Sequence, residues 1–441
     1  MMNLKNNWLL LNLIILVGIF GHSIYRDIQI EKQYPGDLRN RLVGARLQKD
    51  GKLPYFFHWT QADYPRYADP FSSQDSTVPA STITASPFFH ELLIPVCEIP
   101  QRTFSRLWLG MEYIMLIVMV WMICSFNTSR IQKLVTLNVG VLFTLTQAWI
   151  SLIFEGQLYF FTAFLICCIM CALLSNKKSA WVLGGICAAM LVLTRPIALV
   201  IFVPFIFQFR RYPIFLISSI AALGFYGLFV LTNHSEKLLW ENYRLALQKH
   251  TELHQYGDHN IIFNLEGADI PNLEGFDFKE VKENVKNYPV TEATESGSVY
   301  VIYKNITHHK MPLRVLIALS LISLFLLLAV FFYFNRKKPF QVFQVLTFSF
   351  LLYILLEFFS PVERHLYNVV QWFPIILFAF LFLPLQNWKS PVFMLLVLGL
   401  LLSCLTVSWI PDRNTLGEIA WFFACLIIIF SPKYFNSIQW R

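Results

Sequence analysis

Charged residues are scarce in this chain of 441 residues. Asp, Glu, Lys and Arg make up 14% of it and hydrophobic residues 56%, whereas about a quarter of an average soluble domain is charged. The mean hydropathy is +0.53. These values exclude an ordinary soluble protein and predict an integral membrane protein. The formal net charge of +8 is then explained by basic cytoplasmic loops and anionic lipid, so we expect no nucleic-acid partner.

Disulfide, metal and common hydrolase signatures are also missing. Seven of the eight cysteines fall in or beside apolar runs, and Cys97 has no evident partner in its polar loop. Cys168 and Cys171 have a CxxC spacing, but both lie inside a run of membrane-spanning length, so we predict no metal and no cofactor. No HExxH, GxSxG or P-loop motif stands out, and no acidic pair follows Asp37.

Apolar runs near the length of about 20 residues that a helix needs to cross a bilayer recur along the whole chain. They predict an all-α integral membrane protein with about 12 transmembrane helices in a single polytopic domain, 1–441. The fifth and sixth runs are short and flank Arg195-Pro196, which predicts a broken or re-entrant pair. The predicted spans are 8–25, 107–125, 133–153, 158–175, 179–194, 197–209, 213–232, 313–334, 340–359, 366–385, 391–410 and 417–432.

The basic residues set the expected orientation. Lys and Arg gather in every second connection, which predicts that both termini are cytoplasmic and that the first run is an uncleaved signal anchor. Two long loops, 26–106 and 233–312, then lie on the outer face. The second loop is polar and predicts a short helix near 278–287.

The stretch YPGDLRNRLVGARLQKDGKLPY, residues 34–55, follows the first span. On a helix beginning near Asp37, the side chains of Leu38, Leu42 and Ala45 share one face, which predicts a helix lying apolar side down in the outer headgroup layer. Asp37 is then an N-cap. It is also a candidate general base at the membrane surface, and the two roles are compatible.

Four further outer segments hold candidate site residues. The loop after residue 52 is rich in aromatics and prolines and contains His58, Asp63, Asp69 and His90, which suits either sugar binding or membrane anchoring. Glu155-Gly156-Gln157 is either an ordinary turn or part of a site. Arg364 and His365, and separately Arg195, are candidate phosphate ligands; their alternatives are lipid-headgroup anchors and a snorkelling arginine.

Taken in order, these segments resemble the membrane-embedded GT-C glycosyltransferases. The resemblance is nearest to glycosyltransferase family 87, the polyprenyl-phosphate-mannose-dependent mannosyltransferases. In that family an Asp follows the first span and precedes G-x-x-P-Y, as Asp37 precedes Gly51-Lys-Leu-Pro54-Tyr55 here. A Pro-rich aromatic loop, a Gly-Gln pair and a later outer-face His follow, matched by 86–100, by 156–157 and by His365. Tyr159 departs from the Asn that often follows the Gly-Gln pair, and the loop 233–312 has no matching motif.

The resemblance implies transfer of a hexose, such as mannose, from a polyprenyl-phosphate donor to a glycolipid or glycan acceptor, with inversion and without a metal. It implies a catalytic base at Asp37, donor phosphate ligands at Arg364, His365 and Arg195, and substrate contacts from Tyr55, His58, Glu155, Gln157 and Tyr367.

Two other functions remain open from the residues. An O-antigen ligase or polysaccharide polymerase also carries outer Arg and His residues, although the early Asp with G-x-x-P-Y argues against it. A transporter or lipid flippase predicts ionisable residues deep within spans; Glu112, Glu155 and Glu357 are the acids expected there, near span ends. The composition leans towards a bacterial inner membrane with the site on the periplasmic face.

Overall fold

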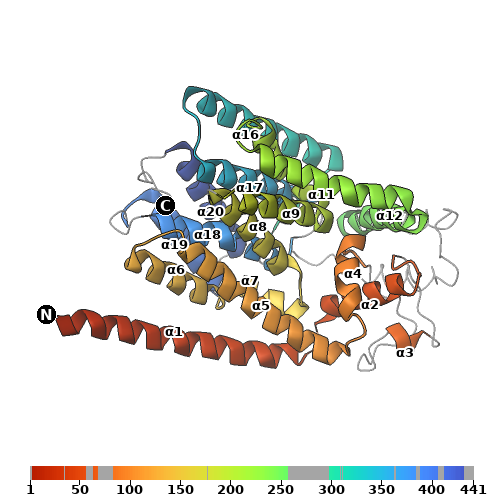
Figure 1. The fold of residues 1–441 in the computed structure, drawn as a ribbon, viewed down its shortest axis with the longest axis horizontal. Coiled ribbons are helices and arrows are strands. Elements are labelled where there is room, and N and C mark those ends of the chain that lie inside the picture. Colours follow the sequence, from red (N-terminus) through yellow and green to blue (C-terminus); the bar gives the residue numbers. More distant parts are fainter. Residues whose placement is uncertain are drawn as a thin grey trace.

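The computed structural model describes residues 2–33, 35–55, 63–67, 83–175, 177–256, 297–307, 309, 311–361, 364–383, 388–405 and 412–431. Within these ranges every regular element is a helix. The helices form a bundle, and the shorter helices α2 (Gly36–Lys49), α3 (Tyr64–Tyr67) and α4 (Pro87–Leu93) lie at one end of it (Figure 1). The protein is therefore a helical membrane protein. This is the outcome expected for long apolar segments, because a helix satisfies its backbone hydrogen bonds internally where no water is available.

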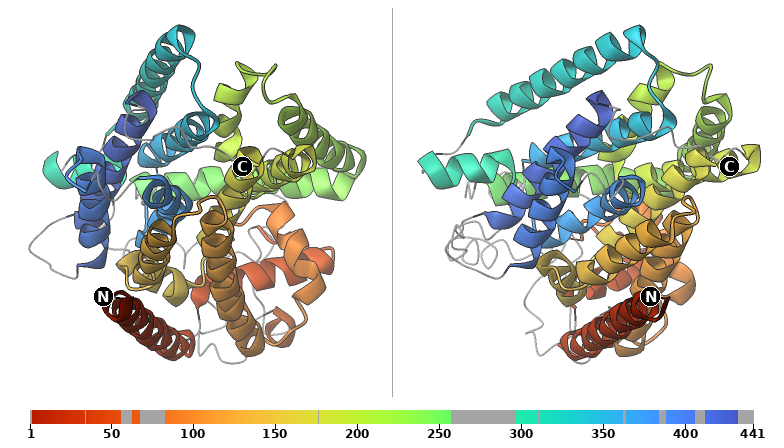
Figure 2. Two further views of the ribbon diagram at one scale, coloured as in Figure 1. Left: turned by 60° about the vertical axis from the view of Figure 1, so that its left-hand side comes forward. Right: turned by 90° about the vertical axis from the view of Figure 1, so that its left-hand side faces the viewer.

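The first half of the bundle starts with α1, which lies along the edge of the molecule and apart from the centre in the further views (Figure 2). Ser129 and Thr146 cap the starts of α6 and α7 by accepting hydrogen bonds from Gln132 and Trp149 backbone amides. The elements are α1 (Met2–Glu31), α2 (Gly36–Lys49), α3 (Tyr64–Tyr67), α4 (Pro87–Leu93), η1 (Ile94–Val96), α5 (Gln101–Cys124), α6 (Arg130–Phe143), α7 (Gln147–Glu155), α8 (Tyr159–Leu174) and α9 (Lys178–Thr194).

The second half supplies the centre of the core. All ten residues of α18, Phe373–Phe382, are buried, and α18 packs against α5, α6 and α8. The elements are η2 (Pro196–Phe202), α10 (Val203–Ile206), α11 (Pro213–Thr232), α12 (His234–Tyr256), α15 (Val299–Thr307), α16 (Leu313–Lys337), α17 (Val342–Phe358), η3 (Leu366–Trp372), α18, α19 (Pro391–Cys404) and α20 (Arg413–Phe430).

Fewer full-length spans are present than the sequence predicts. Within the described residues, five helices are long and apolar enough to cross a membrane: Trp8–Glu31 of α1, α5, α11, α16 and α20. The predicted span 133–153 is instead a pair, α6 and α7, bent by 52°. The break expected at Arg195-Pro196 is present, since α9 ends at Thr194 and the 3₁₀ helix η2 follows. The other predicted spans correspond to apolar helices of 10–17 residues.

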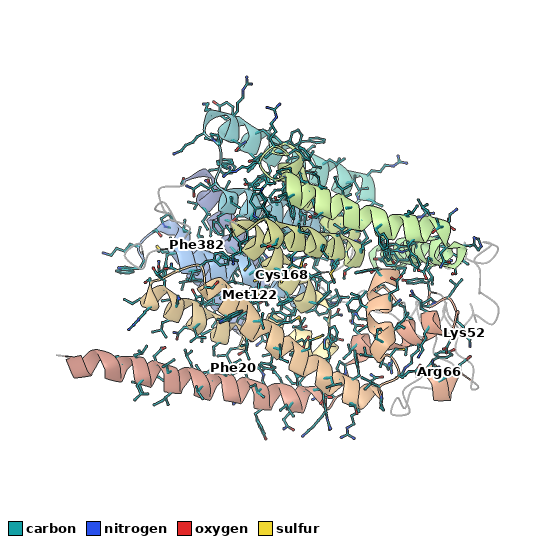
Figure 3. All side chains as sticks on the ribbon, in the orientation of Figure 1. Phe20, Lys52, Arg66, Met122, Cys168 and Phe382 are labelled. Atoms are coloured by element: carbon teal, nitrogen blue, oxygen red, sulfur yellow. The ribbon has the colours of Figure 1, made fainter. Side chains whose placement is uncertain are left out.

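The segments predicted as outer loops gather at one end of the bundle. Helices α2, α3, α4 and α12 lie together there, beside the C-terminal end of α1, and the labelled Lys52 and Arg66 lie in the same region (Figures 1 and 3). The helix predicted near 278–287 falls outside the described residues. This end of the molecule holds most of the candidate site.

Candidate functional site

The predicted helix after the first span exists as α2, but its surroundings differ from the expectation. Leu38, Leu42 and Ala45 are buried, and they pack in one apolar cluster with residues of α4 and α5, including Trp108. The apolar face of α2 therefore rests on protein rather than on lipid. Helix α2 starts directly after Pro35, so Asp37 lies in its first turn and does not cap it. The carboxylate still faces the positive end of the helix dipole.

A sharp corner of the chain meets α2 at this point. Gly156 ends α7 in the left-handed conformation, with φ of 63°. A Cβ atom there would lie 2.6 Å from Leu38 Cβ and 2.7 Å from Pro35 Cβ. Only glycine permits both the backbone angle and the close approach. The Gly-Gln pair thus holds the α7–α8 connection against the start of α2.

A hydrogen-bond network joins the two elements. The Gln157 amide nitrogen donates to Asp37 Oδ2, and its amide oxygen accepts from the Arg41 guanidinium. Arg41 also donates to the Gly156 carbonyl oxygen at 3.2 Å. Arg41 and Gln157 are buried, whereas Asp37 is only half-buried. The predicted residues Asp37 and Gln157 are therefore in direct contact, and Arg41, which the sequence analysis missed, orients the amide between them.

A row of aromatic rings continues from this network. Tyr367 lies in η3, which packs against α7 and α8, the two helices that the Gly156-Gln157 corner connects. Its ring stands 5.0 Å from His365 and 5.1 Å from Tyr159, centroid to centroid.

Arg195 lies at the far side of this row. Its guanidinium lies 4.4 Å from the centre of the Tyr159 ring and donates to Glu357 at 2.7 Å. Asp37, Gln157, Tyr367, His365 and Arg195 are thus brought into one connected region, which we call the Asp37 cluster.

Tyr55 and His90 have structural positions beside this cluster. Tyr55 is fully buried, and its hydroxyl donates to the Ala85 carbonyl oxygen at 2.7 Å, so it is not positioned to contact a substrate directly. His90 is buried, and its ring packs against Gly44 of α2. Burial, with the nearby Arg41 charge, lowers the pKa of His90 to about 3. The imidazole is therefore neutral at physiological pH.

The remaining candidates of the aromatic loop separate into two groups. Asp63 forms an ion pair with Lys52 at 3.1 Å and lies among surface charges. His58 and Asp69 fall outside the described residues, so their predicted roles stay predictions.

Arg364 lies in a different environment from the one expected for a phosphate ligand. Its side chain is 1% exposed, and it makes two hydrogen bonds, of 2.7 and 2.8 Å, to the buried carboxylate of Glu418. Trp372 donates a third hydrogen bond to this carboxylate at 2.8 Å. We therefore assign Arg364 a structural role that fixes η3 to α20. The sequence placed Arg364 beside His365 but gave no sign of Glu418, which lies 54 positions away.

More acids are buried in the helices than the sequence analysis expected. Asp27 accepts hydrogen bonds from Arg26, Tyr113 and Trp149 and ties α1 to α5 and α7. Glu112 lies midway along α5 rather than near its end, and accepts from Trp108 at 3.0 Å. Each of these acids therefore has a donor in the protein, as a carboxylate in an apolar environment requires.

The chemistry available in the Asp37 cluster is that of proton transfer and anion stabilisation. A half-buried carboxylate stands beside amide and phenol groups, with a guanidinium and an imidazole along the same row. Among the described residues, no group of three or more His, Cys, Asp or Glu side chains is arranged to hold a metal ion. No family model matches the chain, and no curated protein or solved structure is significantly similar to it.

Proposed function

We propose that this protein is a membrane glycosyltransferase that moves a hexose from a polyprenyl-phosphate donor to a glycolipid or glycan acceptor. The proposal includes a multi-pass arrangement with the Asp37 cluster at the outer face of a bacterial inner membrane, and shorter helices such as α8, α9 and α17 completing the crossings. The end of the bundle where α2 lies is then the outer end.

The convergence of the Asp37 cluster supports this proposal most directly. Asp37, Gln157, Arg195 and Tyr367 are spread over more than 300 positions of the chain. A hydrogen bond joins Asp37 to Gln157, ring contacts through Tyr159 join Arg195 to Tyr367, and the packing of η3 against α7 brings these two groups together. These are four of the residues that the family resemblance singles out. Packing of the bundle alone does not require polar side chains to converge in this way, because a buried polar group is costly unless it is paired.

Asp37 would act as the general base. The carboxylate takes the proton of an acceptor hydroxyl while that oxygen attacks the anomeric carbon, and the bond to the lipid phosphate breaks. Direct displacement inverts the anomeric configuration. Gln157 holds one carboxylate oxygen, and Arg41 fixes the orientation of the Gln157 amide. Because the same network fixes the whole carboxylate, it also fixes the orientation of the other oxygen, Oδ1.

Arg195 and His365 would stabilise the leaving phosphate. His365 is exposed, and the Arg195 side chain keeps 19% exposure despite its contact with Glu357. Preorganised cations act most strongly where negative charge develops in the transition state. Arg364 is left out of this role because its guanidinium is buried on Glu418.

The test is a transfer assay with purified Asp37→Asn protein, polyprenyl-phosphate hexoses and extracted glycolipids. Loss of a general base is expected to lower the turnover by roughly 10²–10⁴-fold, with the unfolding profile unchanged. Asp50→Asn is the matched control, because Asp50 ends the same helix but pairs with Arg66. Near wild-type turnover by the Asp37→Asn protein would contradict the assignment of Asp37 as the general base.

A transporter is the second candidate, and Glu112 is the observation that favours it. A carboxylate halfway along a membrane helix is a common element of proton and ion pathways. Reconstituted protein that moves a fluorescent lipid or a proton across vesicles, with loss of that movement in Glu112→Gln, would favour transport. The transfer assay, run with a diphosphate-linked lipid donor, separates a polymerase or ligase from the proposed transferase.

A further inference from the structure

A cavity of about 400 Å³ lies between α1 and α5. Ile24 and Ile28 of α1 and Leu109 and Tyr113 of α5 form its walls. Gly110 also lines it, and a Cβ atom on this glycine would meet no other atom within 4 Å. The space is therefore apolar, and its residues belong to two of the helices long enough to span a membrane. We call it the α1–α5 cavity.

The remaining lining residues are ionisable. Lys32 and Arg106 are both exposed, with 58% of the Arg106 side chain accessible. Glu31 is 4% exposed and its carboxylate lies 3.9 Å from Arg106, beyond hydrogen-bonding distance. Within the described part of the chain, Glu31 accepts no hydrogen bond. The carboxylate is thus held by a long ion pair with Arg106, and its oxygens can accept a hydrogen bond from a hydroxyl group that enters the cavity.

The cavity lies at the end of the bundle where α2 is found. Its residues come from the C-terminal part of α1 and the first half of α5, and α2 follows α1 after a short connection (Figure 1). In a membrane this part of a span lies near the headgroup layer. Basic side chains at that depth bind anionic headgroups, while the apolar wall beneath suits a hydrocarbon chain.

We infer that the α1–α5 cavity binds one chain of an anionic membrane lipid whose headgroup carries a hydroxyl group. The lipid phosphate contacts Arg106 and Lys32, and a headgroup hydroxyl donates to Glu31. This inference does not depend on the proposed glycosyltransferase activity, because it concerns a different pair of helices and a different set of charges.

The experiment is native mass spectrometry of the purified full chain, released from detergent and titrated with defined lipids. Phosphatidylglycerol supplies both the charge and the hydroxyls, phosphatidic acid supplies the charge without the glycerol headgroup, and phosphatidylcholine supplies neither. We expect phosphatidylglycerol to bind at least about tenfold more tightly than phosphatidylcholine, with phosphatidic acid between them. Glycerol phosphate added in excess should not compete, because it lacks the hydrocarbon chains.

Three substitutions assign the site. Arg106→Gln should reduce phosphatidylglycerol binding to the level of phosphatidylcholine. Glu31→Ala should reduce it only to the level of phosphatidic acid. Gly110→Leu should lower the binding of every lipid at this site by filling the cavity. Arg102→Gln and Gly18→Leu are the matched controls, because they lie on the same two helices outside the cavity lining.

Arg106 is largely exposed, so its substitution leaves the fold intact even if Gly110→Leu disturbs it. Equal binding of the two phospholipids by the wild type, or unchanged selectivity in Arg106→Gln, overturns the inference.

Discussion

Two arginine–glutamate pairs in this protein make the same contact in different surroundings. Arg364 and Glu418 are 1% and 0% exposed and join through two hydrogen bonds, whereas Arg195 and Glu357 are 19% and 4% exposed and join through one. Arg195 also stacks on Tyr159, at the edge of the Asp37 cluster. The first pair is enclosed by helices, and the second keeps a guanidinium edge available to a ligand. Exposure, rather than residue type, therefore separates the arginine to which we assign a structural role from the one that we propose as a phosphate ligand.

The largest expected effect comes from breaking the enclosed pair. Glu418→Gln leaves the Arg364 charge buried without its counter-ion, so we expect a loss of about 3–5 kcal/mol in the free energy of unfolding. Equilibrium unfolding in mixed detergent micelles measures this loss. The double substitution Arg364→Met with Glu418→Gln should recover most of it, because no unpaired charge remains and glutamine still accepts from Trp372. A double variant as unstable as the single one would contradict the pairing.

Breaking the open pair should affect function more than stability. Arg195→Gln keeps an amide that can donate a hydrogen bond to Glu357. It loses the positive charge that, in our proposal, faces the phosphate of the polyprenyl-phosphate sugar. We expect kcat/KM for the polyprenyl-phosphate donor to fall roughly 10–100-fold, the equivalent of one charged hydrogen bond. Arg195→Lys should recover part of this loss, since charge returns without the stacking geometry. If Arg195→Gln instead lost as much stability as Glu418→Gln, the distinction between the two pairs would disappear.

A carboxyl group that has no cationic partner among the described residues extends the comparison to pH. Glu91 of α4 accepts from the Tyr226 hydroxyl at 2.7 Å. Burial, with the nearby Glu236, raises its pKa to about 7, from an ordinary value of 4.5. The folded protein thus binds the proton more tightly than the unfolded chain does. The stability from Glu91 is complete below about pH 4.5 and is lost as the pH rises through 7.

Glu91→Gln should remove this dependence, because its amide stays neutral. Glu91 is only half-buried, so we expect a gain on the order of 1–2 kcal/mol over the wild type at pH 8 and little difference at pH 5. Thermal unfolding across this pH range is the measurement. A constant difference between the two proteins at all pH values would contradict the assigned titration.

The smallest effect is expected for a third arginine, Arg66, which pairs with two carboxylates and is open to water. Arg66 binds Asp50 at 2.8 Å and Glu98 at 2.6 Å, and holds the pKa of each carboxyl at about 2. All three side chains are at least about a quarter exposed. Arg66→Gln should therefore cost at most about 1 kcal/mol near pH 7, and this difference should vanish as the pH falls towards 2. A loss comparable to that of Glu418→Gln would show that exposure does not rank these pairs.

The local pattern of the sequence predicted α2 well. Its start near Asp37 and its buried face of Leu38, Leu42 and Ala45 follow from helical spacing, which needs only neighbouring residues. The sequence predicted lipid as the partner of that face, and this was wrong because an apolar stripe can pack against lipid or against protein. Pro35, whose backbone is extended, occupies the N-cap position, so Asp37 lies in the first turn of α2 and not at the N-cap.

Contacts between distant segments explain the remaining differences. The family resemblance assigned Asp37 and Gln157 to one site but did not predict their direct contact, and Arg41 had no motif of its own. Glu418 was missed because nothing near it in the sequence points to Arg364. The bend between α6 and α7 had a usable signal in Thr146, which caps α7, but a threonine within an apolar run also occurs in unbroken helices.

The left-handed corner at Gly156 has a consequence for how this protein can vary. Since Gly156 has no side chain, its main chain lies directly against Leu38 and Pro35 at the start of α2. This close approach sets the spacing between the Asp37 carboxylate and the Gln157 amide. Other side chains around the Asp37 cluster can then change without altering this spacing, which the proposed mechanism requires to stay constant. The single methyl group of Gly156→Ala would force the two segments apart. We expect it to separate Asp37 from Gln157 without a change in any polar residue.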